Sequence, residues 1–417
     1  METITRGDRD RLRALAAQQA ELAASDGMKR LYADWRAHGR FEKSARPMLT
    51  IELGTFADEI IPGMLRCEGA RARRVEAMLL SNVIPHTIFG DDTPIRDHVP
   101  VALKKRFAPL GLDVRKQDAD DSGAAGVGHH FETYLHDLEE DWGLLGPSRW
   151  ALDVDAAQRE VEELGELFGD LLPVRRAGET LCVDAAEDLI HLMAMEDLYV
   201  AMIDTPELVH EMVERLLSDY HRYLDEWESR GLILPTAGDE PLPQGSYCFD
   251  GKLPDKGSGL HCSQVWGHMN AEEMNDVSPG MYREFIIDHY RPMAARFGAL
   301  SFGCCEAVHK FWDGCIETLP NLRKVSISAW CDETMMGERL RGREIVYLRK
   351  PTANLLGVGS QLDEDAVRAH FRHTAEAASG CRLEITQRDV YLIHGGFDKV
   401  ARYISLARES VERYWKA

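Results

Sequence analysis

The sequence predicts an α/β protein: a (β/α)8 TIM barrel with an N-terminal helical extension and an inserted lid-like segment. Three observations support this fold class. Short apolar runs alternate with amphipathic stretches, most regularly from about residue 150 onward. Eight such runs can be counted along the chain, and metal-capable side chains follow several of them directly. Alternation of this kind implies a parallel sheet, and eight units imply a closed barrel. A doubly wound open sheet is the alternative, but we find no G-x-G-x-x-G or G-x-x-x-x-G-K-[ST] phosphate loop to support it.

Length and composition exclude several classes of protein. The 417 residues fit one α/β barrel with additions, and 44% hydrophobic with 29% charged residues is typical of a globular protein. The net charge of -21 argues against nucleic acid or an anionic membrane as a partner. No apolar stretch approaches a membrane span, and the N-terminus lacks the apolar segment of a signal peptide. Nine scattered cysteines, an odd number, favour a reduced, cytoplasmic protein.

The N-terminal part is expected to be helical. Residues 1–80 are predicted as the extension, with helices over 1–46 and from about 59 to 80, because apolar residues recur there at helical spacing. Residues 81–417 are predicted as the barrel. Val83 to Phe89 is expected to be its first strand, closed by Gly90, Asp91 and Asp92. The Asp- and Gly-rich stretch from about 94 to 147 has no clear period and is expected to be an insertion or lid.

The remaining elements follow in alternation. Pro206 at the first position and Gly231 at the end bound a long amphipathic helix. Further helices are predicted from Ser278 to Gly298, with a kink at Pro292, and near 307–317, 333–341, 363–379 and 397–414. The eight strands are expected near residues 83, 180, 232, 261, 300, 325, 345 and 383.

The most informative residues follow the predicted strand Ala299–Phe302: Gly303, Cys304, Cys305 and Glu306. Thiolate and carboxylate are ligand types that hold Zn²⁺. In the alternative interpretation, the cysteines are small buried hydrophobic residues and Glu306 caps the next helix. Cys304 is expected to point away from the site, because neighbouring residues on a strand face opposite sides.

Two more residues are candidates to complete the zinc site. His309 lies three residues after Glu306, which would place both side chains on one face of a helix start. Asp389, on the last strand, could reach across the barrel mouth. The alternatives are a surface histidine and an aspartate paired with Arg388 or Lys350. We therefore predict a Zn²⁺ held by Cys305 and Glu306 and completed by His309 or Asp389, and the last two are also the candidate catalytic acids.

Polar and aromatic residues at other predicted strand ends are candidates for substrate binding. They are Asp92, Trp266, His268, Trp330 and Lys350. The tryptophans could line a pocket for a flat, apolar ligand such as a methoxyaromatic compound.

Four segments resemble the uroporphyrinogen decarboxylase superfamily: Asp204–His210, Gly303–Glu306, Pro320–Ser328 and Arg349–Pro351. The likeness extends from about residue 180 to 410, and it implies a (β/α)8 barrel. It places Gly303 and Cys305 where metal-dependent members carry a His-x-Cys motif. The last strand offers Gln387, Arg388 and Asp389 where those members have a further cysteine, so the implied ligand set is altered.

The resemblance implies one of two chemistries. The true decarboxylases act on a tetrapyrrole and carry an N-terminal motif of the type P-x-W-x-M-R-Q-A-G-R, to which Arg46–Leu49 is the nearest stretch here. The other branch comprises zinc-dependent methyltransferases that exchange a methyl group with a corrinoid protein, and members are often dimers.

The absent arginine motif favours the second branch. We expect a methyltransferase that moves a methyl group from a small O-methyl substrate to a corrinoid (cobalamin) partner protein, with Zn²⁺ as cofactor. The resemblance also allows a homodimer, although the sequence does not fix the oligomeric state. The alternatives are a decarboxylase-like lyase acting on a tetrapyrrole or another carboxylic acid, and a non-catalytic binder of metal or tetrapyrrole.

Overall fold

Seven parallel strands form the central sheet of this computed structural model, which describes residues 4–118 and 129–417. Their order is β1 (Met48–Ile51), β15 (Arg382–Gln387), β14 (Val346–Arg349), β13 (Leu322–Ile327), β12 (Ala299–Phe302), β11 (Trp266–Met269) and β8 (Leu181–Val183). Each neighbouring pair is parallel, and the first strand lies beside the last one in the chain. The predicted α/β class with a parallel sheet is thus confirmed.

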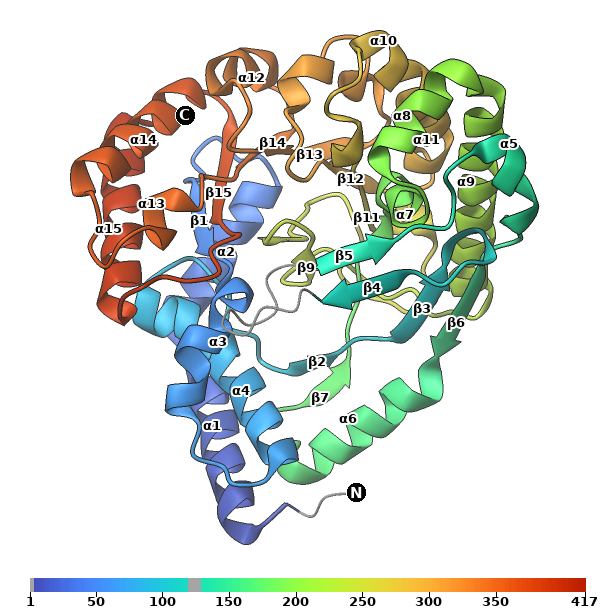
Figure 1. Cartoon of the computed structure of the whole chain (residues 1–417). Coiled ribbons are helices and arrows are strands. Elements are labelled where there is room, and N and C mark those ends of the chain that lie inside the picture. The colour runs from blue at the N-terminus through green and yellow to red at the C-terminus, as the bar shows by residue number, and fades with distance from the viewer. Residues whose placement is uncertain (1–3, 119–128) are drawn as a thin grey trace.

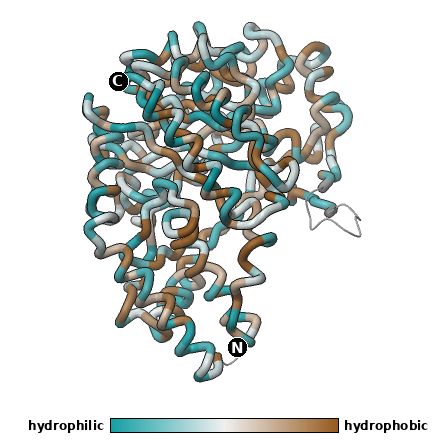
Figure 2. The backbone as a smooth tube through the Cα atoms, turned by 90° about the vertical axis from the view of Figure 1, so that its left-hand side faces the viewer, coloured by the Kyte–Doolittle hydropathy of each residue, from teal (hydrophilic) through white to brown (hydrophobic). Residues whose placement is uncertain are grey.

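Helices surround the curved sheet (Figure 1). The longer ones are α1 (Arg6–Ala24), α2 (Asp26–Gly39), α4 (Ala70–Ile84), α6 (Val154–Phe168), α7 (Ala185–Leu192), α8 (Met195–Asp204), α9 (Pro206–Ser229), α11 (Asp288–Ala294), α12 (Glu333–Leu340), α14 (Glu364–Ala377) and α15 (Phe397–Tyr414). The short ones are α3 (Ala57–Ile60), α5 (Leu138–Asp141), α10 (Pro279–Tyr282) and α13 (Asn354–Gly357). In Figures 1 and 2, α1, α4 and α6 form a narrower end of the molecule, which carries the N-terminus.

Four two-stranded sheets complete the described elements. They pair β2 (Val99–Val101) with β7 (Val174–Arg176), β3 (Lys104–Ala108) with β6 (Arg149–Asp153), β4 (Arg115–Asp118) with β5 (His129–Glu132), and β9 (Pro241–Leu242) with β10 (Ser246–Tyr247). The predicted insertion from about 94 to 147 thus contains β2 to β5 and α5, apart from residues 119–128, which lie outside the described part.

The predicted eight-stranded closed barrel differs from the structure in two strands. Val83 to Phe89 is helical, because it continues the buried stripe of α4 into the one-turn helix Pro85–Phe89. Leu232 to Leu234 is extended but joins no sheet. One strand, β1, was not counted among the eight. Within the described residues the sheet ends at β1 and β8, and no hydrogen-bonded strand pair closes it.

The boundary predicted at residue 80, between an N-terminal extension and a barrel domain, remains a prediction. β1 lies before it and is hydrogen-bonded to β15, with Met48 opposite Glu384 and Ile51 opposite Gln387. The segment before residue 80 therefore contributes a strand to the central sheet as well as helices.

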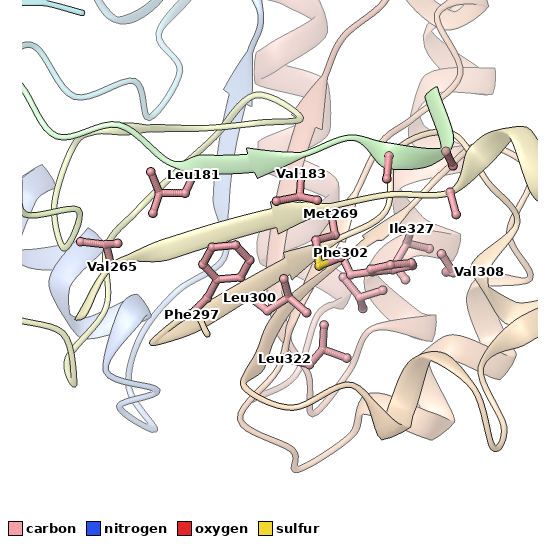
Figure 3. Close-up of a cluster of buried hydrophobic side chains, with 14 of the residues drawn as sticks. Leu181, Val183, Val265, Met269, Phe297, Leu300, Phe302, Val308, Leu322 and Ile327 are labelled. Carbon is pink, nitrogen blue, oxygen red and sulfur yellow. The ribbon is translucent and has the colours of Figure 1, made fainter. Parts of the chain in front are cut away.

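The two faces of the sheet have different chemistry. Leu181, Val183, Met269, Leu300 and Phe302 point outward into the large core between strands and helices (Figure 3). The opposite face carries polar residues, among them His268, Lys324 and Glu384. Buried charges of this kind are tolerated only when they are paired or hydrogen-bonded.

Lys324 and Glu384 meet across this inner face. Lys324 Nζ lies 2.6 Å from Glu384 Oε1 and donates to Ser246 Oγ and the Tyr247 carbonyl, both at 2.8 Å. Ser246 and Tyr247 belong to the hairpin β9–β10, so this ion pair fixes the hairpin inside the curve of the sheet.

In the described part of the chain, no helix combines the length and apolarity needed to span a membrane.

Candidate metal centre

The chain turns sharply where β12 ends. Gly303 has φ +98°, a backbone conformation that glycine adopts without strain, and its N–H donates to the Met269 carbonyl of β11 at 2.9 Å. The alternation of side chains between the two faces of the strand therefore stops at Gly303. Cys304 and Cys305 therefore lie in a bend, not on opposite faces of a strand.

The bend brings both thiols together. Cys304 Sγ lies 3.6 Å from Cys305 Sγ and donates to it. The predicted outward orientation of Cys304 is wrong, because the strand has already ended at Phe302. The Cys304 carbonyl accepts from Ser326 Oγ at 2.9 Å, which holds the bend against β13.

A third donor comes from the loop after β11. Glu272 Oε2 accepts from the Cys305 N–H at 2.9 Å. One ligand atom each from Glu272, Cys304 and Cys305 lies within 4.8 Å of the others, the one such group of three found among the described residues. We call these three residues the thiol–carboxylate cluster.

The electrostatics distinguish the two cysteines. The hydrogen bond from Cys304 lowers the pKa of Cys305, and Lys350, whose Nζ lies 3.9 Å from Cys305 Sγ, lowers it further against the opposing effect of burial. The same hydrogen bond and burial raise the pKa of Cys304. Cys305 is therefore the thiol that ionises first.

Glu306 has a different environment from the one that the sequence predicted. Its side chain is buried, and its carboxylate accepts from the N–H groups of Cys304 and Ala271. Burial raises the pKa of Glu306. Glu306 thus stabilises the bend through these hydrogen bonds, and it is not part of the thiol–carboxylate cluster.

The other two predicted ligands are also outside the set. His309 Nδ1 accepts from the Asp332 N–H at 3.3 Å, and burial lowers the pKa of the ring. Asp389 follows β15 with φ +60°, and its Oδ1 lies 3.3 Å from Arg388 Nε. Its charge still raises the pKa of Cys305, so the two groups interact through space.

The five predicted substrate-binding residues are spread over different environments. Trp330 is 74% exposed and lines a cavity of about 430 Å³ together with Cys305 and Glu272. Lys350 is buried beside Cys305. His268, on β11, is also buried, and burial together with the charges of Lys350 and Arg388 lowers its pKa to about 3 despite a contact with the Ser301 backbone.

Trp266 and Asp92 lie away from the cluster. Trp266 is buried in the core, where its Nε1–H donates to the Cys248 carbonyl at 2.8 Å. Asp92 accepts two hydrogen bonds from Arg46, both at 3.0 Å, and further ones from Arg408 and the Leu49 N–H. These contacts fix Asp92 against β1 and α15.

Sequence reasoning missed Glu272. The strand before it was expected near residue 261, whereas β11 spans Trp266–Met269, so Glu272 is three residues from the true strand end. The sequence feature that could have identified Glu272 is an acidic pair, Glu272 and Glu273, shortly after an apolar run. Glu273 is buried beside it, and burial with the nearby carboxylates raises its pKa to about 8.

Comparisons with known proteins place this chain in no family. No family model matches the sequence, and no curated protein matches it. Among solved structures, a methyltransferase from Methanosarcina mazei is similar at 12% identity and a TM-score of 0.49, covering 91% of this chain and 98% of that chain. A likeness at this identity and score assigns neither a fold family nor an activity.

Proposed function

We propose that this protein is a zinc-dependent methyltransferase that moves a methyl group from a small O-methyl substrate to a corrinoid protein. The observation that carries the proposal is the thiol–carboxylate cluster at the carboxyl end of a parallel sheet. Active sites of barrel-like α/β proteins lie at this edge, where loops from several strands converge.

The donor set fits zinc. Two thiolates bound at about 2.3 Å to one tetrahedral zinc ion lie roughly 3.8 Å apart. The two sulfurs of Cys304 and Cys305 are 3.6 Å apart, and Glu272 adds a carboxylate oxygen. Three protein ligands would leave one position open, as in catalytic zinc sites. This proposed set keeps Cys305 and replaces the other predicted ligands, Glu306, His309 and Asp389.

The chemistry needs an activated leaving group, since an alkoxide or phenoxide leaves poorly. When bound, Zn²⁺ would act as a Lewis acid on the leaving oxygen. Lys350 favours the thiolate form of Cys305, which is the form that binds metal. Asp389 stays our predicted acid for the leaving oxygen; its carboxylate pairs with Arg388, so it would first take up a proton from solvent and then deliver it. The corrinoid of the partner protein would be the nucleophile.

The neighbouring cavity suits a small, partly apolar substrate. Ile190, Met195, Tyr199 and Trp330 contribute apolar surface to its lining, and Cys305 and Glu272 contribute the reactive edge. A volume of about 430 Å³ is within the range of small-molecule sites. Trp266 does not line it, so Trp330 and Tyr199 are the aromatic walls that we propose for a methoxyaromatic ring.

Metal content tests the cluster directly. We expect about one zinc ion per wild-type chain and a strong loss in Cys304→Ala, Cys305→Ser and Glu272→Gln, because each removes one of three donors. Cys381→Ala is the matched control, since Cys381 is buried elsewhere, with its Sγ 3.3 Å from the Gly337 carbonyl. Equal zinc in all five proteins, or none in the wild type, would contradict the proposal.

The reaction is tested by mixing the protein with a reduced corrinoid protein and a panel of methyl donors, and following methylation of the corrinoid by its absorption spectrum. We expect methylation from an O-methyl donor in the wild type and not in Cys305→Ser. Decarboxylation of a tetrapyrrole without any corrinoid methylation would favour the lyase alternative.

A further inference from the structure

Two cations at the carboxyl edge of the sheet share one neutral acceptor. Lys350 follows β14 and donates from Nζ to Gln244 Oε1 at 2.7 Å, and Arg388 follows β15 and donates from Nη1 to the same oxygen. Lys350 is only 3% exposed. A buried ammonium group is costly unless an anion accompanies it, and Lys350 Nζ has the neutral Gln244 amide at 2.7 Å and the Cys305 sulfur only at 3.9 Å.

The orientation of Arg388 is fixed from its other side. Its Nε lies 3.1 Å from Glu52 Oε2 and 3.3 Å from Asp389 Oδ1. These two carboxylates hold the Nε edge of the guanidinium and direct Nη1 toward Gln244. The fork geometry of arginine is suited to a planar carboxylate or amide presented at this edge.

His268 adds an unused polar group next to the same two cations. It is 1% exposed, and among the described residues neither ring nitrogen makes a hydrogen bond of good geometry, although the Ser301 backbone contacts the ring. Lys350 and Arg388 are the charged groups that act on this ring. A buried imidazole whose ring nitrogens lack such bonds is available to hydrogen-bond a polar group of a ligand.

Gln244 reaches the cations from the tip of the hairpin β9–β10. Gln244 and Gly245 both have a left-handed backbone, with φ +75° and +76°. A Cβ on Gly245 would lie 2.5 Å from Thr386 Cγ2, so glycine is required for the tip to lie against β15. Gln244 and Gly245 at this tip line a cavity of about 620 Å³ that also contacts β1, so an incoming molecule in this cavity would reach the side chain of Gln244.

We propose that Lys350, Arg388 and His268 form a carboxylate-binding subsite, in which the side-chain amide of Gln244 occupies the place of the substrate's carboxylate. This inference rests on the proposed function, because Lys350 lies 3.9 Å from Cys305 Sγ and so links the subsite to the thiol–carboxylate cluster. The methyl donor is then an acidic compound, a methoxy-substituted carboxylic acid, and its carboxylate displaces Gln244 as it binds.

Substitutions at Gln244 test this without knowledge of the natural substrate. Gln244→Glu supplies a tethered carboxylate of the same shape, so we expect a higher melting temperature at pH 7, with a gain that shrinks in high salt. Gln244→Ala is the control for loss of the side chain and should lower the melting temperature. If Gln244→Glu melts below the wild type, the subsite is not an anion site and the proposal is overturned.

Binding of small probes tests the ligand class by calorimetry on the protein as purified. We expect 4-methoxybenzoate to bind on the order of tenfold more tightly than the neutral 4-methoxybenzyl alcohol, the factor for one charge-assisted hydrogen bond. Arg388→Gln should remove this difference and Arg388→Lys should keep part of it. Gln244→Ala should tighten 4-methoxybenzoate binding and Gln244→Glu should abolish it.

Two outcomes would overturn the carboxylate assignment: equal affinity for the acid and the alcohol, or competition by inorganic phosphate as strong as that by 4-methoxybenzoate. A purely structural role of Gln244 predicts weaker binding in Gln244→Ala, the opposite sign from ours. Zinc content is measured on the same samples. A protein that binds the acid without zinc would contradict the proposed function alone, and a protein with zinc and no preference for the acid would contradict this inference alone.

Discussion

Cys304 and Cys305 are adjacent residues whose thiols differ strongly in acidity. Cys305 accepts the hydrogen bond and its sulfur lies 3.9 Å from Lys350 Nζ, while Cys304 donates the hydrogen bond. Thiol reactivity follows the thiolate fraction and access. Without bound metal, the pair therefore presents one reactive sulfur, that of Cys305, and one that keeps its proton, that of Cys304.

We expect iodoacetamide to modify Cys305 faster than Cys304 at pH 7 in chelator-treated protein, because its pKa is lowered. Peptide mass spectrometry over a time course measures this. Lys350→Met should slow the modification of Cys305 by removing the neighbouring charge. Equal rates at the two cysteines would show that the hydrogen bond does not set their acidity.

Protonation of the Asp188 carboxyl group, on α7, should make the free energy of unfolding depend on pH. Burial raises its pKa to about 8, partly offset by a hydrogen bond from Tyr220 Oη at 2.6 Å. The folded protein therefore holds a proton there that the unfolded chain releases near pH 4, so stability should fall as pH rises from about 4 to 8.

Asp188→Asn keeps an acceptor for Tyr220 and cannot ionise. We expect its free energy of unfolding, measured by urea titration at pH 6 and pH 9, to fall less with pH than that of the wild type. Parallel pH dependences for the two proteins would contradict the raised pKa.

At the level of whole elements, sequence patterns predicted strands better than they predicted pairing. The runs at β8, β12 and β14 are largely apolar, and apolar residues recur between polar ones in β13 and β15, so all five could be found without a structure. Val83 to Phe89 looks the same in sequence but continues the buried stripe of α4, and short apolar runs do not distinguish helix from strand.

The candidate site was predictable only in part for a related reason. The cysteine pair stands out because it follows a strand directly, but Glu272 comes from the neighbouring strand's loop, and its approach to Cys305 depends on strand order and on the bend at Gly303. Neither the strand order nor the bend can be inferred from the pattern and spacing of residues in the sequence. The role of Glu306 as an acceptor for two backbone N–H groups likewise needs the folded bend.

Helix packing gives a prediction at this scale. A Cβ on Gly337 of α12 would lie 1.9 Å from the Ala377 carbonyl of α14, so the two helices touch through backbone at this point. Gly337→Ala should destabilise the protein by about 1–3 kcal/mol, as expected for overpacking. Gly165→Ala on α6 is the matched control, because among the described residues no heavy atom beyond the adjacent residues and nearby backbone of α6 lies within 4 Å of its Cβ position.

That control should instead stabilise the protein by about 0.5–1 kcal/mol, since alanine is the better helix former. Thermal and urea unfolding of the two variants measure both values. A stabilising Gly337→Ala would mean that α12 can move away from α14 without cost.

The molecule as a whole is held from inside by the ion pair between Lys324 and Glu384. It joins β13, β15 and the hairpin β9–β10, and both side chains are almost fully buried, at 2% and 3% exposure. Removing one partner leaves an uncompensated buried charge. This pair therefore decides whether the hairpin stays within the curve of the sheet.

Glu384→Gln should cost about 3–5 kcal/mol of unfolding free energy, the usual effect of breaking a buried pair. Glu376→Gln, which breaks an exposed pair with Arg372, should change it by less than about 1 kcal/mol. Similar small effects for both would mean that water reaches Lys324 inside the sheet.

The pairing of the first strand with the last has a consequence for synthesis. The hydroxyl groups of Thr50 and Thr386 lie 3.0 Å apart although 336 positions separate them. At about 5–20 residues per second on the ribosome, β1 emerges tens of seconds before the strand that pairs with it. Until β15 has left the exit tunnel, the edge of β1 is available to chaperones or to other nascent chains, and every premature stop before residue 382 yields a polypeptide that keeps this edge unpaired.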